Sequence, residues 1–71
     1  MEKGWKNILN SSDEYLVTMA RDLLQDEGIE SVVINHKDSS YIIFGEYELY
    51  VRELDEQKAA IILEQINKGR N

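Results

Sequence analysis

Cysteine and proline are both absent from this 71-residue chain, and glycine occurs only four times. Without cysteine, the chain has neither a disulfide framework, nor a thiolate metal site, nor a cysteine nucleophile. Because the glycines are scattered and proline is missing, no segment has the composition of a linker or a low-complexity region. We therefore expect a single domain over residues 1–71, with an ordered core over about residues 5–67.

Long apolar runs and positive charge are also scarce. No segment approaches the roughly 18 apolar residues that cross a bilayer, and the N-terminus does not resemble a signal peptide, so we expect a cytoplasmic protein without membrane contacts. Eight basic residues against fourteen acidic ones give a net charge of −6. Such a chain repels a phosphate backbone, which argues against a nucleic-acid partner. At 42% hydrophobic residues, it is apolar enough to fold.

The N-terminal half of the chain is predicted to form a strand and then a helix. Residues 5–10 read as a short strand, although their alternation is imperfect. Ser11 has the capping-box spacing to a following acidic residue, and Ser12 could cap the helix instead. The helix should run over about residues 12–27 and end at Gly28, where a left-handed residue fits. Its inward stripe, spaced by three and four residues, is Leu16, Met19, Ala20, Leu23 and Leu24.

Two further strands are predicted in the second half. Residues 29–35 are rich in β-branched side chains, which favours a strand buried on much of both faces. Residues 46–51 alternate between polar and apolar side chains, which is typical of a half-buried strand. Residues 41–44 could be an earlier part of that same strand, with Gly45 as a bulge. The inward side chains of the last strand are then Tyr47, Leu49 and Val51.

A second helix is predicted to begin at Asp55. Asp55 suits the N-cap, and Leu54 and Ala59 have the spacing of a hydrophobic staple, in which the residue before the cap packs on the first full turn. Ile61 should lie on the outward side of this helix, where it could mark a partner surface. The inward stripe is Ala59, Ile62, Leu63 and Ile66.

These elements assemble into an α+β fold of the type βαββα. A right-handed crossover makes the first two strands parallel, and inserting the third strand between them gives the order 1-3-2 with the third strand antiparallel. Both helices then cover one face, as in a ferredoxin-like sheet that lacks its fourth strand. The open face and the two edges could pair with a second copy, or Glu46 and Glu48 could keep that face solvated.

Three segments resemble the signature of a small bacterial family described as "putative prokaryotic signal-transducing protein". These segments are Asn35–Tyr41, Phe44–Glu46 and Glu48–Val51, and the resemblance extends from Trp5 to about Ile66. The resemblance implies bacterial origin and a compact fold similar to the PII (GlnB-like) signal proteins. Some relatives append a zinc-binding cysteine segment, and PII-like proteins bind nucleotides through basic, glycine-rich loops. This chain has neither feature, so we expect no cofactor.

The polar loop over residues 35–46 is the candidate site. His36 and Asp38 could hold a metal, but zinc needs three or four ligands and the chain has no second histidine. Residues so close in sequence rarely form a Ser-His-Asp triad, so we do not expect an enzyme. Asp38 and its neighbours could simply order the loop through Asx and Ser turns. The residues predicted to bind a ligand or partner are Asn35, Lys37, Asp38, Ser39, Ser40, Tyr41 and Glu46.

Two hypotheses of function follow. In the first, a small binding module recognises a small ligand or a protein partner through residues 35–46. In the second, an interaction domain without a small-molecule ligand forms a homodimer, or docks a partner, through its open sheet face or an edge strand.

Overall fold

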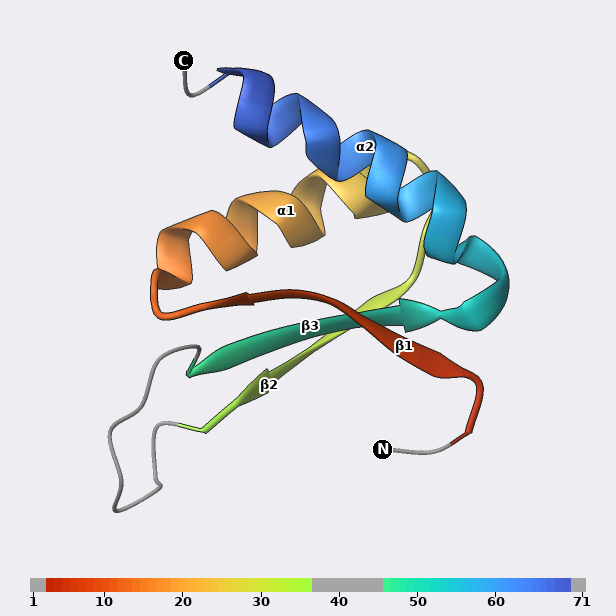
Figure 1. The fold of residues 1–71 in the computed structure, drawn as a ribbon, viewed down its shortest axis with the longest axis horizontal. Helices are drawn as coiled ribbons and strands as arrows, with labels where there is room; N and C mark the ends of the chain where they lie inside the picture. The colour runs from red at the N-terminus through yellow and green to blue at the C-terminus, as the bar shows by residue number, and fades with distance from the viewer. Residues whose placement is uncertain (1–2, 37–45, 70–71) are drawn as a thin grey trace.

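The computed structural model describes residues 3–36 and 46–69. Its elements follow the chain as a β-α-β-β-α sequence (Figure 1). They are β1 (Trp5–Ser11), α1 (Glu14–Asp26), β2 (Ser31–Asn35), β3 (Tyr47–Arg52), the short 3₁₀ turn η1 (Glu53–Asp55) and α2 (Glu56–Gly69). The predicted strand over residues 41–44 and its bulge at Gly45 lie outside the described residues.

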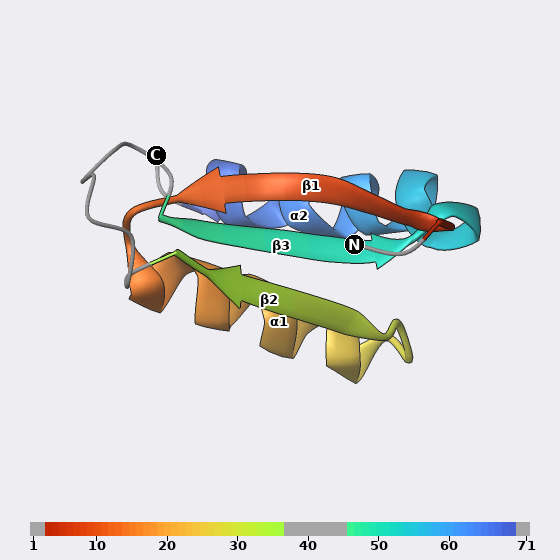
Figure 2. The same ribbon diagram turned by 90° about the horizontal axis from the view of Figure 1, so that it is seen from below.

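The sheet has the predicted order, with β3 in the middle and antiparallel to both β1 and β2. Both helices lie on the same side of the sheet and leave the opposite face open (Figures 1 and 2). The core therefore forms between one face of β3 and the two helices. Its buried side chains are Val17, Ala20, Leu24, Ile29, Tyr47, Leu49, Val51, Ala59, Ile62 and Ile66.

A bulge in β1 explains its imperfect alternation. The pairing with β3 shifts between Asn7 and Leu9, so that Ile8 and Leu9 both pack against the core although they are consecutive. The Asn7 side-chain amide donates to the backbone carbonyl of Leu49 at 3.2 Å and to that of Leu9 at 3.4 Å. This side chain ties the irregular strand to the central one.

The start of α1 differs from the prediction. The N-cap is Asp13, whose Oδ1 accepts hydrogen bonds from the backbone N–H groups of Tyr15 and Leu16 at 3.0 and 3.3 Å. Neither Ser11 nor Ser12 caps the helix as predicted, because β1 continues through Ser11. The Ser11 hydroxyl instead accepts from the backbone N–H of Asp13 at 2.9 Å.

The cap leads to a stability prediction. Asp13→Ala removes the acceptor of two otherwise unpaired amides, and we expect it to lower the free energy of unfolding by about 1 kcal/mol. Urea denaturation followed by circular dichroism measures this loss. Ser12→Ala is the matched control, because Ser12 is exposed and was the other candidate cap. An equal loss in both variants would contradict the assignment of Asp13 as the cap.

The predicted stripe of α1 packs as expected, with one addition. Val17 is 1% exposed, so the centre of the stripe is Val17, Ala20 and Leu24, while Leu16, Met19 and Leu23 flank it half-buried. Gly28 ends the helix at φ +79° as predicted.

The entry to α2 differs from the prediction at one residue. Leu54 is 84% exposed, so the predicted staple to Ala59 is wrong. The turn η1 occupies Glu53–Asp55 and runs directly into the helix, which leaves Leu54 pointing into solvent. Ile61 is 64% exposed and lies on the outward side as predicted.

Candidate functional site on the open face of the sheet

The open face is the side of the sheet that the helices leave uncovered. Along β3, Tyr47, Leu49 and Val51 are buried beneath the helices, so the alternate side chains point to the open face. The strand register places side chains of β1 and β2 beside them. We call this surface the open face, made by Trp5, Asn7, Asn10, Glu30, Val32, Ile34, His36, Glu48, Tyr50 and Arg52.

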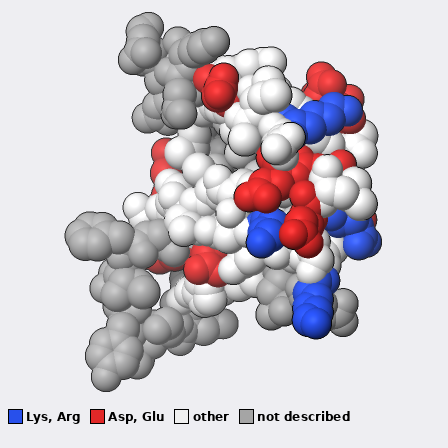
Figure 3. Space-filling model, turned by 45° about the vertical axis from the view of Figure 1, so that its right-hand side comes forward, with Lys and Arg blue, Asp and Glu red and all other residues white. Residues whose placement is uncertain are grey.

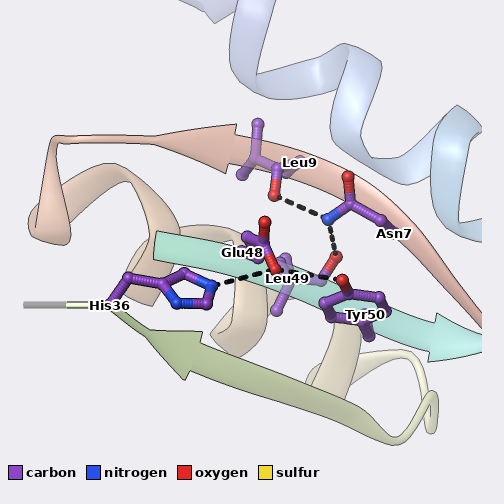
Figure 4. Close-up of polar contacts among 6 residues, drawn as sticks. All are labelled: Asn7, Leu9, His36, Glu48, Leu49 and Tyr50. Carbon is purple, nitrogen blue, oxygen red and sulfur yellow. Dashed lines mark hydrogen bonds and ion pairs between the residues drawn. The ribbon is translucent and has the colours of Figure 1, made fainter. Parts of the chain in front are cut away.

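Three of these residues form a chain of polar contacts (Figure 4). His36 Nε2 lies 3.2 Å from Glu48 Oε1, and the Tyr50 hydroxyl donates to the same oxygen at 3.0 Å. The hydrogen bond from His36, followed by that from Tyr50, holds the pKa of Glu48 below its ordinary value of 4.5. Donation to this carboxylate in turn raises the pKa of Tyr50 above 10.0. At neutral pH the Glu48 carboxyl group is therefore ionised and the Tyr50 phenol keeps its proton.

These contacts give an expected pH dependence. Because the pKa of Glu48 is lower in the folded chain, its contribution to stability is present above 4.5 and is lost as the pH falls through the folded value. We expect the native chain to lose more unfolding free energy than Glu48→Gln between about pH 5.5 and about pH 3. Urea denaturation at each pH measures how steeply the unfolding free energy of the native chain and of Glu48→Gln falls with pH. Equal slopes would show that Glu48 is not stabilised in the folded state.

Arg52 contacts two other side chains at the other end of the open face. Its guanidinium lies 4.7 Å from the centre of the Trp5 ring, within the range of a cation–π contact. Its Nε and Nη2 also lie 3.2 and 3.1 Å from Glu30 Oε1. These side chains come from all three strands or their ends, so the sheet holds them together.

The predicted loop site is described only at its base. Asn35 ends β2 opposite Tyr47, and the backbone carbonyl of Glu46 accepts a 2.8 Å hydrogen bond from the backbone N–H of His36. This bond closes the hairpin where the loop begins. The predicted residues Lys37, Asp38, Ser39, Ser40 and Tyr41 lie outside the described residues.

The structure also brings together residues that the sequence did not single out. Trp5 and Arg52 are far apart along the chain, and the pairing of β1 with β3 makes them neighbours. Glu48 was predicted as a solvated strand residue, but it accepts two side-chain contacts. The alternation of β3 had placed Glu48 and Tyr50 on the same side, which was the available signal. Within residues 3–36 and 46–69, no three His, Asp or Glu side chains converge as a metal site would require.

Three grooves between described elements are small. The grooves between α1 and β2 have volumes of about 300 Å³ each, and one between β1 and α2 has about 220 Å³. Pockets that enclose small molecules usually measure about 300–1,000 Å³. These three grooves are therefore at or below the lower limit of that range.

Comparison with known families adds to this geometry. A family model described as "Putative prokaryotic signal transducing protein" matches residues 5–67, which include all three strands and most of α2. The chain belongs to this family. Neither a curated protein nor a solved structure matches the chain. Among the described residues of this family member, no helix has both the length and the apolar character needed to cross a membrane.

Proposed function

We propose that this family member is a binding module without enzymatic activity, which docks a basic segment of a partner protein on its open face. This proposal takes the second hypothesis from the sequence, interaction through the sheet. The family description supports a role in signal transduction. The apolar side chains left on the uncovered side of the sheet support the choice of surface.

The observation that carries the proposal is the composition of the open face. Trp5, Val32, Ile34 and Tyr50 are only half-buried there, although a helix or a second sheet would normally cover such side chains. Tryptophan, tyrosine and arginine are the residues that most often dominate binding energy at protein interfaces. Arg52 is already held by Trp5 and Glu30, so little side-chain freedom is lost when a partner binds.

Charge selects the class of partner. The net charge of −6 attracts a basic segment at long range. In Figure 3, Lys and Arg side chains lie among Asp and Glu instead of forming a patch of one sign. On the side that Figure 3 shows, the attraction therefore comes from the net charge and not from a local acidic patch. The carboxylates of Glu48 on the open face and of the half-buried Glu46 just before β3 add negative charge locally.

Site-specific photo-crosslinking in bacterial cells tests this proposal. A photoreactive phenylalanine analogue at Tyr50 should give an adduct with one protein, and sequencing should place the link beside lysine or arginine residues. The same analogue at Tyr15, which is 75% exposed on α1, is the matched control and should not give that adduct. Equal adducts at both positions, an acidic linked segment, or a link only to a second copy would overturn the proposal.

A second candidate function rests on the contacts at the base of the loop. His36 and Glu48 place an imidazole beside a carboxylate where β2 leaves the sheet, so together they could orient a small polar ligand. This function is close to the first hypothesis from the sequence, which placed recognition on residues 35–46 and did not include Glu48. A thermal-shift screen against nucleotides and metabolites tests it, because a ligand of the native state raises the melting temperature with dose. A shift that His36→Ala abolishes would support this function, whereas a screen without shifts would reject it.

A further inference from the structure

The two edges of the sheet differ in how they resist pairing with another strand. Natural edge strands are commonly protected by bulges and by charged side chains. The edge strand β1 has both, since it is bulged at Asn7–Leu9 and carries the exposed Lys6. The other edge, β2, pairs with β3 in unbroken register over its five residues and contains no charged side chain. Within the described residues, β2 therefore lacks both of the protections that β1 has.

The hydrogen bonds of β2 show which of its backbone groups face outward. His36 donates to Glu46, so this pair is hydrogen-bonded across the hairpin. In an antiparallel ladder, hydrogen-bonded pairs alternate with non-bonded ones, so Ile34 and Val32 also bond to β3. The N–H and C=O of Val33, at the centre of β2, therefore point away from β3. They have the alignment that a further strand needs.

We propose that β2 pairs antiparallel with β2 of a second copy, about a two-fold axis at Val33. In this register, Val33 pairs with Val33 of the second copy and exchanges two backbone hydrogen bonds with it. On the open face, Val32 faces Ile34 of the second copy, and the symmetry repeats this contact. Pairs of β-branched side chains are favourable across strands. The result is one continuous sheet to which each copy contributes its three strands.

Charge complementarity selects a second copy as the occupant of this edge. The same register places Glu30 opposite His36 of the second copy, one step beyond β2 on each side. Glu30 already binds Arg52, and His36 already binds Glu48. The pairing would therefore create a row that alternates between basic and acidic side chains, from Arg52 through Glu30 to His36 and Glu48 of the second copy. A strand of an unrelated protein would not be expected to carry charges that match this alternation.

This inference rests on the geometry and the charges of the β2 edge and does not depend on the proposed partner. If it holds, the open faces of the two copies merge into one surface across the axis. A partner with two binding segments would then engage both copies, and its apparent affinity would rise through effective concentration.

Sedimentation velocity over a concentration series tests the pairing with two matched variants. Ile34 and Asn10 flank Glu48 on opposite sides of β3, so Ile34→Lys and Asn10→Lys both place a lysine beside the same carboxylate. We expect the native chain and Asn10→Lys to form dimers. Ile34→Lys should raise the dimer dissociation constant by about tenfold or more, because a lysine replaces Ile34 in both of the symmetric Val32–Ile34 contacts beside the axis. A native chain that stays monomeric, or equal effects of the two variants, would overturn the proposal.

Disulfide trapping tests the register and does not depend on the lysine variants. The chain has no cysteine, so one introduced thiol can form a disulfide only between two chains. In a hydrogen-bonded antiparallel pair the Cα atoms are about 5.5 Å apart, which a disulfide can bridge. Val33→Cys should form a covalent dimer on mild oxidation much faster than Asn10→Cys. Equal rates would reject the axis at Val33, and circular dichroism checks that both variants fold.

Discussion

Leu49→Ala is expected to lower the free energy of unfolding by about 3 kcal/mol. Leu49 is 0% exposed and lies on the central strand between Leu9 and Val33 of the flanking strands. Its truncation removes apolar contacts and leaves a cavity where three strands and the helices meet. A domain of this size has a total stability on the order of 5 kcal/mol. Only about 2 kcal/mol would then remain, so a few per cent of the Leu49→Ala chains should be unfolded at about 25 °C.

Urea denaturation measures this loss, and Leu54→Ala is the control. Both variants make the same chemical change, but Leu54 is 84% exposed, so its replacement should change the unfolding free energy by less than about 0.5 kcal/mol. The melting temperature of Leu49→Ala should fall by roughly 10–25 °C. Similar losses in the two variants would contradict the placement of β3 at the centre of the core.

Gly28→Ala should produce the second largest loss, about 1–2 kcal/mol. Gly28 has φ +79°, and its N–H donates to the Gln25 carbonyl at 2.9 Å. The next N–H, of Ile29, donates to the Leu24 carbonyl at 2.9 Å, which completes a Schellman motif. A Cβ at Gly28 would meet nothing within 4 Å, so the expected cost is that of the left-handed backbone and not of a clash.

Gly28→Asn separates backbone strain from other causes. Asparagine tolerates the left-handed region better than alanine, so Gly28→Asn should lose clearly less stability than Gly28→Ala. Thermal and urea unfolding of both variants give the comparison. If asparagine were as costly as alanine, the positive φ would not explain the requirement for glycine, and the helix end would need another account.

The family description concerns signal transduction, and the structure supplies surfaces that suit binding. The open face carries apolar side chains and preset ionic contacts, while the β2 edge offers aligned backbone groups. In the proposed dimer these surfaces are adjacent, so partner binding and self-association would be coupled. The two proposals can be rejected separately. The crosslinking experiment tests partner contact at Tyr50, whereas the sedimentation experiment tests dimer formation with a substitution at Ile34.

Local patterns in the sequence predicted the fold well. The three- and four-residue spacing of apolar side chains in α1 and α2, and the alternation in β3, are each set within a few neighbouring residues. The order 1-3-2 followed from the handedness of the first crossover and from short connections. The errors fell at element ends. Asp13 and the two serines before it are all residues that commonly cap helices, so the sequence did not single out Asp13. The 3₁₀ turn at Leu54 has no strong sequence signal.

The sequence alone thus determined which segments are helices and strands, their topology and the inward side of each, because these depend on neighbours along the chain. Only the tertiary structure decided the composition of the open face. Trp5 and Arg52 meet through strand register, and a bulge in β1 sets that register. His36 reaches Glu48 through the separate register of β2 on β3, which has no bulge. Pairing between distant segments depends on the packing of the whole sheet, which no local pattern encodes.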